Sequence, residues 1–394
     1  MEEGYDVIVV GAGSAGATVA ARLTEGPRVR VLLLEAGGPD RKPAIHIPAA
    51  FPKLFRTAMD WNYDTEPQPG LGDRRVYWPR GKTLGGSSSI NAMVWVRGFA
   101  ADYDHWAAVA GSGWGWESAV ECFRRIETTE DAAGDHQGRS GPMSVSQLRD
   151  PNPLTDAFLQ ACTEVGLGRT APSEINGPSP EGVAQTPVTQ RRGRRCSTAD
   201  AYLKPARRRP NLTVLTGALT TQVLFQGTRA VGVEYWHRGA TRQARADAEV
   251  VLSAGAINMP ALLMHSGIGP ADHLRSLAIP LLADVPEVGR NLADHLVLPI
   301  VVGVDSSQTL YDAETRRQLL RYLIRRRGML TSNIAEAFGF VRSKSGHRAA
   351  RHRAALRAWA VRRRRTGQAG GARHYHRCHP AAAAQHRLHH ASLQ

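Results

Sequence analysis

Three glycines near the N-terminus have the spacing of a phosphate-binding turn. Gly11, Gly13 and Gly16 form a G-x-G-x-x-G pattern directly after an apolar run, and Glu35 follows Gly16 by about twenty residues. In such a pattern the first glycine permits a tight turn, the second lets the backbone approach a pyrophosphate, and the third lets a helix pack on a strand. The helix N-terminus would face the phosphates and Glu35 the ribose hydroxyls. The pattern predicts a dinucleotide site, and the acid disfavours the 2′-phosphate of NADP.

A strand, a helix and a second strand have to position these residues. Residues 5–10 are a short apolar run, and residues 17–23 repeat apolar side chains at helical spacing. A second continuous apolar run ends at Glu35, which is typical of a parallel strand that is buried on both faces. A glycine turn alone occurs in many folds, so a purely structural turn is the alternative. The flanking strands and the acid favour the binding site.

A second glycine-rich stretch, RGKTLGGSSSINAMVWVRG, spans residues 80–98. It places Gly85, Gly86 and three serines together and then runs directly into Asn91 and an apolar segment. A surface linker would stay polar, whereas side chains this small let a backbone come very close to something large and flat. The alternative is a Gly-Ser loop without a role.

The remaining pattern predicts an α/β fold. Residues 39–79 are rich in proline and aromatic residues and indicate an irregular connection over the surface. Further on, the sequence predicts helices, a short strand, a meander with its turn at 226–228, and a strand and helix that return to the first sheet. The corresponding segments are 106–111, 117–127 and 153–167 for the helices, 142–147 for the strand, 211–236 for the meander and 248–269 for the return.

Charge and cysteine content limit the classes of function. The net charge is +15, but residues 347–394 hold eleven arginines and no acid, so the remainder has 39 basic against 35 acidic residues. The basic clusters at 190–195 and 206–210 contain no aromatic residue, so we interpret them as solvated loop charges, not as a nucleic-acid groove. The four cysteines lack paired spacing, and we expect no signal peptide and no membrane span. A reduced, cytoplasmic setting fits best.

At these motifs the chain resembles the glucose-methanol-choline oxidoreductases, flavoenzymes that oxidise alcohols. The resemblance covers about residues 4–345 in the family's order, and Met259 departs from it where the second signature usually has Ser or Thr. The segments that carry it are GAGSAG with LLLEAG, RGKTLGGSSSINAMVWVRG, CSTADAYLKP, RAVGVEY, SAGAINMPALLMHSGIG and VGRNLADHL.

The resemblance implies a Rossmann-like FAD-binding domain with an inserted α+β substrate domain of antiparallel sheet and helices. It divides the chain into residues 1–100 as the first part of the FAD-binding domain, 101–210 as a mixed region with substrate-domain elements, 211–295 as the meander and the return to the FAD-binding domain, 296–346 as a substrate-domain segment, and 347–394 as a tail rich in Arg, Ala and His. The segment that closes the site at the family's C-terminus is expected to be missing.

The resemblance also implies the cofactor contacts. Small residues around Gly85 would make room for the isoalloxazine ring, and backbone groups at 91–94 would address its edge. Ile90 stands where some members carry a histidine bonded to the flavin, so FAD is expected to bind noncovalently. The expected cofactor-binding residues are Gly11, Gly13, Ser14, Ala15, Gly16, Glu35, Ala36, Arg80, Leu84, Gly85, Ser88, Asn91, Ala92, Met93, Val94 and Thr220.

The family's reaction transfers a hydride from an alcohol carbon to flavin N5 while a base takes the hydroxyl proton. The base is usually a histidine near the family's C-terminus, beyond the point where this resemblance ends, so no residue here is assigned the catalytic role. His295 is a substitute by residue type only, since its segment is structural in the family. We expect an FAD-dependent alcohol oxidoreductase with a small-molecule alcohol as substrate. The alternatives are an inactive FAD-binding fragment, a non-redox flavin lyase and, last, a basic binding module.

The composition changes abruptly after Lys344, to a segment rich in Arg, Ala and His without any acid. Three explanations stay open for it. HYHRCH at 374–379 has metal-ligand residue types but no supporting acids, so no metal site is expected. A basic nucleic-acid or membrane tail is the second explanation. The one we favour is that translation leaves the family's reading frame near residue 346.

Overall fold

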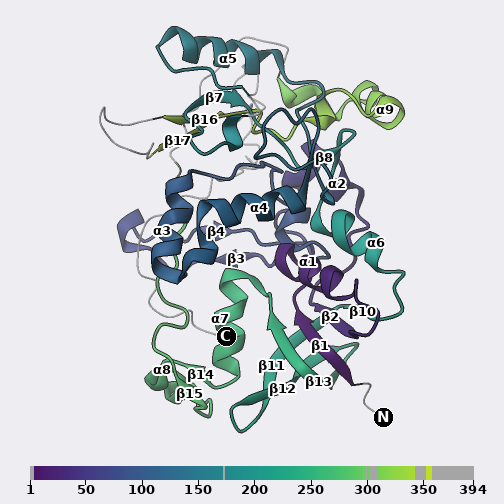
Figure 1. The fold of residues 1–394 in the computed structure, drawn as a ribbon, viewed down its shortest axis with the longest axis vertical. Coiled ribbons are helices and arrows are strands. Elements are labelled where there is room, and N and C mark those ends of the chain that lie inside the picture. The colour runs from purple at the N-terminus through teal and green to yellow at the C-terminus, as the bar shows by residue number, and fades with distance from the viewer. Residues whose placement is uncertain are drawn as a thin grey trace, which may run out of the picture.

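The computed structural model describes residues 4–171, 174–295, 297, 300, 309–341 and 352–356. A six-stranded sheet lies at one end of the long axis, a three-stranded sheet at the other, and α3 and α4 lie between them (Figure 1). Of the tail from 347 onward only the backbone of 352–356 falls within this range. The metal, binding and reading-frame explanations of the tail therefore lie outside the described residues.

The large sheet combines parallel and antiparallel strands in the order β10-β2-β1-β13-β12-β11. β10, β2, β1 and the end of β13 run parallel, whereas β11, β12 and β13 form an antiparallel meander. This mixed sheet with its helices agrees with the α/β class. The strands are β1 (Tyr5–Val10), β2 (Val31–Glu35), β10 (Leu212–Thr216), β11 (Ala218–Gln226), β12 (Arg229–His237) and β13 (Ala240–Leu252).

Both faces of the parallel strands are covered. Alternate side chains of β1 and β2 point to opposite faces, as the two-residue period of a strand requires. Val7, Val9 and Leu33 pack against α1 (Ser14–Leu23), whose small buried residues let the helix approach closely. Ile8, Val10 and their neighbours on β2 pack against the meander. All five residues of β2 are buried, which confirms the prediction of a strand covered on both sides.

The second sheet has the order β17-β16-β7 and is antiparallel. Its strands and those of the two-stranded pairs are β3 (Tyr63–Asp64), β4 (Tyr77–Trp78), β5 (Glu127–Thr129), β6 (Met143–Val145), β7 (Gly182–Gln185), β8 (Gln190–Arg191), β9 (Arg194–Arg195), β14 (Ile268–Gly269), β15 (Ala283–Asp284), β16 (Ala337–Val341) and β17 (His352–Leu356). The other helices are α2 (Pro43–His46), α3 (Ala100–Ala110), α4 (Trp116–Ile126), α5 (Pro153–Glu164), α6 (Lys204–Ala206), α7 (Gly255–His265), α8 (Ala271–Ser276) and α9 (Arg316–Arg325).

Most predicted elements form where the sequence indicated. α3, α4, α5 and β6 overlap the expected segments, and the turn between β11 and β12 falls at 226–229. β13 returns to pair with β1 and leads into α7. The division into two domains stays a prediction. None of the helices in the described part of the chain combines the length and apolar character that crossing a membrane requires.

Candidate cofactor site

The two glycine-rich segments meet at the carboxyl ends of β1 and β2. The Gly85 N–H donates to the carbonyl of Ala12 at 2.8 Å. A Cβ added to Gly86 would lie only 2.7 Å from the Cα of Gly13, so the backbones of the two turns are in direct contact. Ligands of doubly wound sheets bind at this edge. The structure therefore brings together the segments that the sequence predicted to share one ligand.

The contacts of the first turn show which of its glycines the packing requires. Gly11 has φ +93°, and a Cβ there would lie 2.6 Å from the Ser253 carbonyl oxygen. A Cβ on Gly16 would lie 1.9 Å from the Gly11 carbonyl oxygen. On Gly13 it would meet only the Cα of Gly86, at 3.9 Å. The protein's own packing thus requires Gly11 and Gly16, whereas a Cβ at Gly13 would make only an ordinary van der Waals contact, so this packing does not account for the glycine at position 13.

The start of α1 leaves an anion-binding end accessible. Gly13 is the N-cap residue and provides no side-chain cap, and no acid occupies the first turn. Ser14 and Ala15 are exposed. The first N–H groups of a helix lack intrahelical partners and carry the positive end of its dipole. These features fit a pyrophosphate group.

Glu35 ends β2 and is buried, with 5% of its surface exposed. Its Oε2 accepts the Ala12 N–H at 2.9 Å, and its Oε1 accepts the Gly37 N–H at 2.8 Å. Burial raises the pKa of this carboxyl, although the two N–H groups and the charge of Lys82 oppose the rise. Each ionised oxygen has a further lone pair, so the carboxylate can still accept ribose hydroxyls. Ala36 follows it and is half-buried.

Serine hydroxyls fasten the second glycine turn, which forms a short 3₁₀ helix over Gly86–Ser89. Ser88 Oγ lies 2.6 Å from the Gly85 carbonyl and 2.9 Å from Thr198 Oγ1, and it accepts the Thr198 N–H. Leu84 is buried in the cluster between α1 and the sheet, its N–H donates to the Gly38 carbonyl at 3.1 Å, and its carbonyl accepts Ser89 Oγ at 2.7 Å. The serines therefore stabilise a turn that carries almost no side-chain bulk.

Arg195 is buried against the second glycine turn, which corrects the interpretation of its cluster as solvated charge. The basic cluster at 190–195 was interpreted as solvated charge, yet Arg195 is only 1% exposed. Its guanidinium donates to the carbonyls of Ile45, Ser88 and Asn91 and to Asn91 Oδ1, at 2.7–3.0 Å. Burial lowers the pKa of Arg195 to about 9, so the group remains a cation at neutral pH. A charge with four acceptors can be buried because its donors are satisfied.

Residues 91–94 form a turn held by the surrounding chain. The Met93 N–H donates to Asn91 Oδ1, and Met93 is fully buried with φ +58°. The Ala92 carbonyl accepts Asn333 Nδ2 at 3.0 Å, and the Met93 carbonyl accepts the Thr189 N–H at 2.8 Å. Val94 forms an isolated antiparallel β-bridge with Val188. Both carbonyls are therefore committed to protein donors.

The sequence also singled out Arg80, Ile90 and Thr220. Arg80 is half-buried, stacks on Trp78 at 5.4 Å and lies 4.0 Å from an Asp294 oxygen. Ile90 is 2% exposed and packs in an apolar cluster with Ile45, so it offers no atom for a covalent flavin bond. Thr220 Oγ1 is buried and has no hydrogen-bond partner within the described part of the chain.

β11 approaches Glu35 through its first residues. The Gly217 N–H, just before β11, donates to the carbonyl of Gly37 at 2.8 Å. This contact places the strand that carries Thr220 beside the segment that follows Glu35. A buried hydroxyl without a partner in the described part of the chain is consistent with a bound group that supplies one.

His295 is exposed beside Asp294. Over the ranges that the structure covers, no three His, Cys, Asp or Glu side chains gather in an arrangement that would hold a metal ion.

Sequence reasoning missed several residues that build the site. Gly37 and Gly81 belong to it, since a Cβ on Gly37 would lie 2.0 Å from the Lys82 carbonyl oxygen and one on Gly81 2.2 Å from that of Gly86. Both adjoin the recognised motifs, so their position was a usable signal. Thr198 lies in the segment CSTADAYLKP that carried the resemblance, so its position was also a usable signal. Arg195 offered none, because nothing in a basic run marks which arginine is buried.

A protein-family model described as GMC oxidoreductase matches residues 5–297. An uncharacterised GMC-type oxidoreductase of Mycobacterium tuberculosis is 55% identical over 349 residues, which are 87% of this chain and 65% of that protein. An alcohol dehydrogenase (acceptor) of Pseudomonas putida is 43% identical over 349 residues, 86% of this chain and 63% of that protein.

Solved structures agree with these matches. A formate oxidase variant of Aspergillus oryzae, solved to study FAD modification, superimposes with a TM-score of 0.80 at 30% identity and covers 87% of this chain and 62% of that one. The chain thus spans less than two thirds of the length of these three proteins.

Proposed function

The chain belongs to the GMC oxidoreductase family, and we propose that it is an FAD-dependent oxidoreductase that acts on the CH–OH group of a small alcohol. The family match confirms the resemblance predicted from the separated motifs. FAD is the cofactor of this family, and the Pseudomonas putida relative is named for alcohol oxidation, which supports an alcohol as the substrate class. The observation that carries the proposal is the contact between Gly13 and Gly86 beside the uncapped start of α1.

We assign the parts of FAD to the residues that fit them. The N–H groups at Ser14 and Ala15 would hold the pyrophosphate, and Glu35 would accept the ribose hydroxyls. The Thr220 hydroxyl would find its missing partner on the adenosine half. The carbonyls of Ala92 and Met93 are already paired, and the N–H groups of Asn91 and Met93 donate to the Ser87 carbonyl and to Asn91 Oδ1. We therefore assign the N–H groups of Ala92 and Val94 to the flavin edge. Ile90 supports noncovalent binding.

When bound, the flavin supplies the hydride acceptor. The chain's own contribution is positioning. Arg195 fixes the backbone of Ser88 and Asn91, and the Ser88 hydroxyl fixes the turn that must lie against the ring. Both act through rigid hydrogen bonds and not by proton transfer. We assign the general base to none of the described residues.

We also propose how the chain is divided between two domains. We propose that the parallel strands and the meander belong to the FAD-binding domain. The three-stranded sheet with α5 and α9 would belong to the inserted substrate domain. The alcohol would then bind between the 91–94 turn and this second sheet.

The visible spectrum of the purified full chain tests the proposal. A flavin spectrum that bleaches when a primary alcohol is added without oxygen is the expected result. Colourless protein that does not take up added FAD would overturn the cofactor assignment. A flavin spectrum that persists with every alcohol in a panel, choline included, would limit the chain to FAD binding. Cyanide release from a cyanohydrin without bleaching would indicate a lyase.

A further inference from the structure

The helix α9 concentrates arginine and leucine in one short segment. Between Thr315 and Ala335 the chain holds six arginines and no acidic residue. The helix itself reads RRQLLRYLIR and is capped at its start by the Thr315 side chain, which accepts the Gln318 N–H. It lies at the edge of the molecule (Figure 1).

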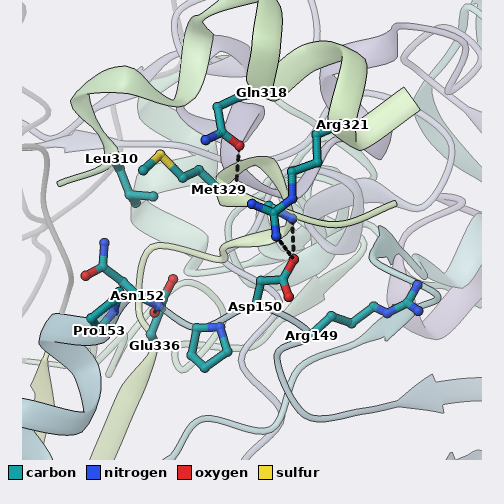
Figure 2. A pocket seen from close by; sticks show the side chains of 11 residues that line it. Arg149, Asp150, Asn152, Pro153, Leu310, Gln318, Arg321, Met329 and Glu336 are labelled. Atoms are coloured by element: carbon teal, nitrogen blue, oxygen red, sulfur yellow. Dashed lines mark hydrogen bonds and ion pairs between the residues drawn. The ribbon is translucent and has the colours of Figure 1, made fainter. Parts of the chain in front are cut away.

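The inner side of α9 is anchored to the protein. Tyr322 is fully buried, and its hydroxyl donates to the His46 carbonyl at 3.3 Å. Arg321 and Arg327 pair with the two oxygens of Asp150 at 3.3 and 3.1 Å. Figure 2 shows Arg321 and Gln318 pointing from the helix toward Asp150 and Met329. These contacts fix the rotation of the helix about its axis.

The fixed rotation turns an apolar face outward. Leu320 and Ile324 lie about half a turn from the buried Tyr322, and Leu319 and Leu323 adjoin them on one side. Their exposed fractions are 43% for Leu319, 58% for Leu320, 55% for Leu323 and 70% for Ile324. Four large apolar side chains exposed on one ten-residue helix form a contiguous patch, not scattered surface residues.

Positive charge borders this patch. Arg317, Arg321 and Arg325 recur every four residues along the other side of the outward face. Arg316, Arg317 and Arg325 have no ion pair with any residue that the structure describes, whereas the nearby Glu314 is neutralised by Lys53 at 2.8 Å. An apolar stripe with an arginine border and no acid is typical of helices that lie in a lipid interface.

We propose that the outer face of α9 docks onto an anionic lipid surface. The leucines and Ile324 would enter the boundary between headgroups and acyl chains, and the unpaired arginines would contact the lipid phosphates. A second copy of the chain fits the face less well, because an antiparallel symmetric contact would bring the two arginine borders together. The binding is peripheral and weakens with salt, because its electrostatic part is screened. It is independent of FAD.

Co-sedimentation of the full chain with vesicles tests this proposal. We compare phosphatidylcholine vesicles with vesicles that also contain phosphatidylserine. The tail holds eleven further arginines, so the wild-type chain alone does not identify the surface. The decisive variants are Leu320→Ser with Ile324→Ser, and Arg316→Gln with Arg317→Gln. Val109→Ser with Val165→Ser is the matched control, since these residues are 78% and 76% exposed, Val109 within α3 and Val165 as the C-cap residue of α5.

Vesicle binding by these variants distinguishes lipid docking from a contact between copies of the chain. The leucine–isoleucine pair and the arginine pair should each weaken binding to phosphatidylserine vesicles by about tenfold or more, since each arginine contributes about fivefold, and the control pair should not. Wild-type vesicle binding by Leu320→Ser/Ile324→Ser would overturn the proposal. So would a concentration-dependent dimer without vesicles that this variant abolishes, because the face would then be a contact between copies.

A probe on the helix gives a second measurement that does not depend on the tail. An environment-sensitive fluorophore on Ile324→Cys, with Cys122 and Cys378 replaced by serine, should shift its emission to the blue when phosphatidylserine vesicles are added. The same probe on Val109→Cys should not shift. An unchanged spectrum at position 324 while the protein co-sediments would show that the tail alone binds lipid, which also overturns the proposal.

Discussion

Gly13 and Gly86 touch through their backbones, so that a Cβ on Gly86 would lie 2.7 Å from the Cα of Gly13. The two residues belong to segments that are far apart in the sequence, and each segment is made of residues with little or no side chain. Their contact brings the start of α1 and the Gly-Ser turn to one edge of the sheet. The proposed cofactor site depends on this relationship more than on any single polar contact.

Gly86→Ala should abolish FAD binding while most of the fold persists. The new Cβ would overlap the Gly13 backbone, and the residue has φ +51°, a conformation that costs an L-residue about 1 kcal/mol. The two turns would have to separate. Flavin absorbance of the purified protein and titration with FAD measure the effect.

Gly113→Ala is the control, because a Cβ there would meet nothing within 4 Å. It should retain the FAD content of the wild type. If Gly86→Ala also binds FAD with wild-type affinity, the two turns do not form the site that we propose.

Arg195→Met should lower the free energy of unfolding by about 3 kcal/mol or more. The side chain is buried, and its loss leaves the carbonyls of Ser88, Asn91 and Ile45 without donors. FAD affinity should fall as well, since the turn loses its support. Denaturant unfolding and FAD titration measure the two effects.

Arg208→Met provides the comparison, because Arg208 is exposed in the other basic cluster. It should change the unfolding free energy by about 0.5 kcal/mol or less. Equal effects of the two substitutions would mean that Arg195 does not hold the turn.

The sequence predicted the parts of the fold that short-range patterns encode. The apolar runs of β1 and β2 and the glycines between them indicated strand, turn and helix, because burial on both faces and tight turns restrict residue type locally. Arg195 could not be predicted in this way. Its burial depends on the carbonyls of Ile45 and Asn91, which only the complete fold brings beside it. For the same reason the outward face of α9 was not anticipated, since the contacts of Tyr322 and Arg321 fix it.

Acid should destabilise the protein through His46. Its Nε2 lies 2.7 Å from the Asp40 carbonyl, and its Nδ1 is buried without a hydrogen-bond partner among the described residues. Burial, followed by the charge of Arg194, lowers the pKa of His46 below 6.5, although Asp200 opposes the change. The unfolded chain therefore binds a proton near pH 6.5 that the folded chain resists. The resulting stability is present above that pH and is lost as the pH falls through the folded pKa.

His46→Gln should flatten this part of the pH profile. Thermal unfolding between about pH 7 and about pH 5 compares the variant with the wild type and with His105→Gln, an exposed control. The control should follow the wild type. A His46→Gln profile as steep as that of the wild type would exclude His46 as the source.

Thr220→Val should change apoprotein stability and FAD affinity in opposite directions. The Thr220 hydroxyl is buried without a hydrogen-bond partner among the residues that the structure describes, so replacing it by a methyl group of the same shape removes an unsatisfied polar atom and should stabilise the FAD-free protein by about 1 kcal/mol. If the hydroxyl pairs with FAD, the same change removes one neutral hydrogen bond and weakens FAD binding about fivefold. Thr221→Val is the matched control: Thr221 Oγ1 pairs with Glu234 at 3.0 Å, so its loss should slightly destabilise the apoprotein and leave FAD affinity unchanged. A Thr220→Val protein that is more stable but binds FAD as the wild type does would show that this hydroxyl faces an empty space in the protein and not the cofactor.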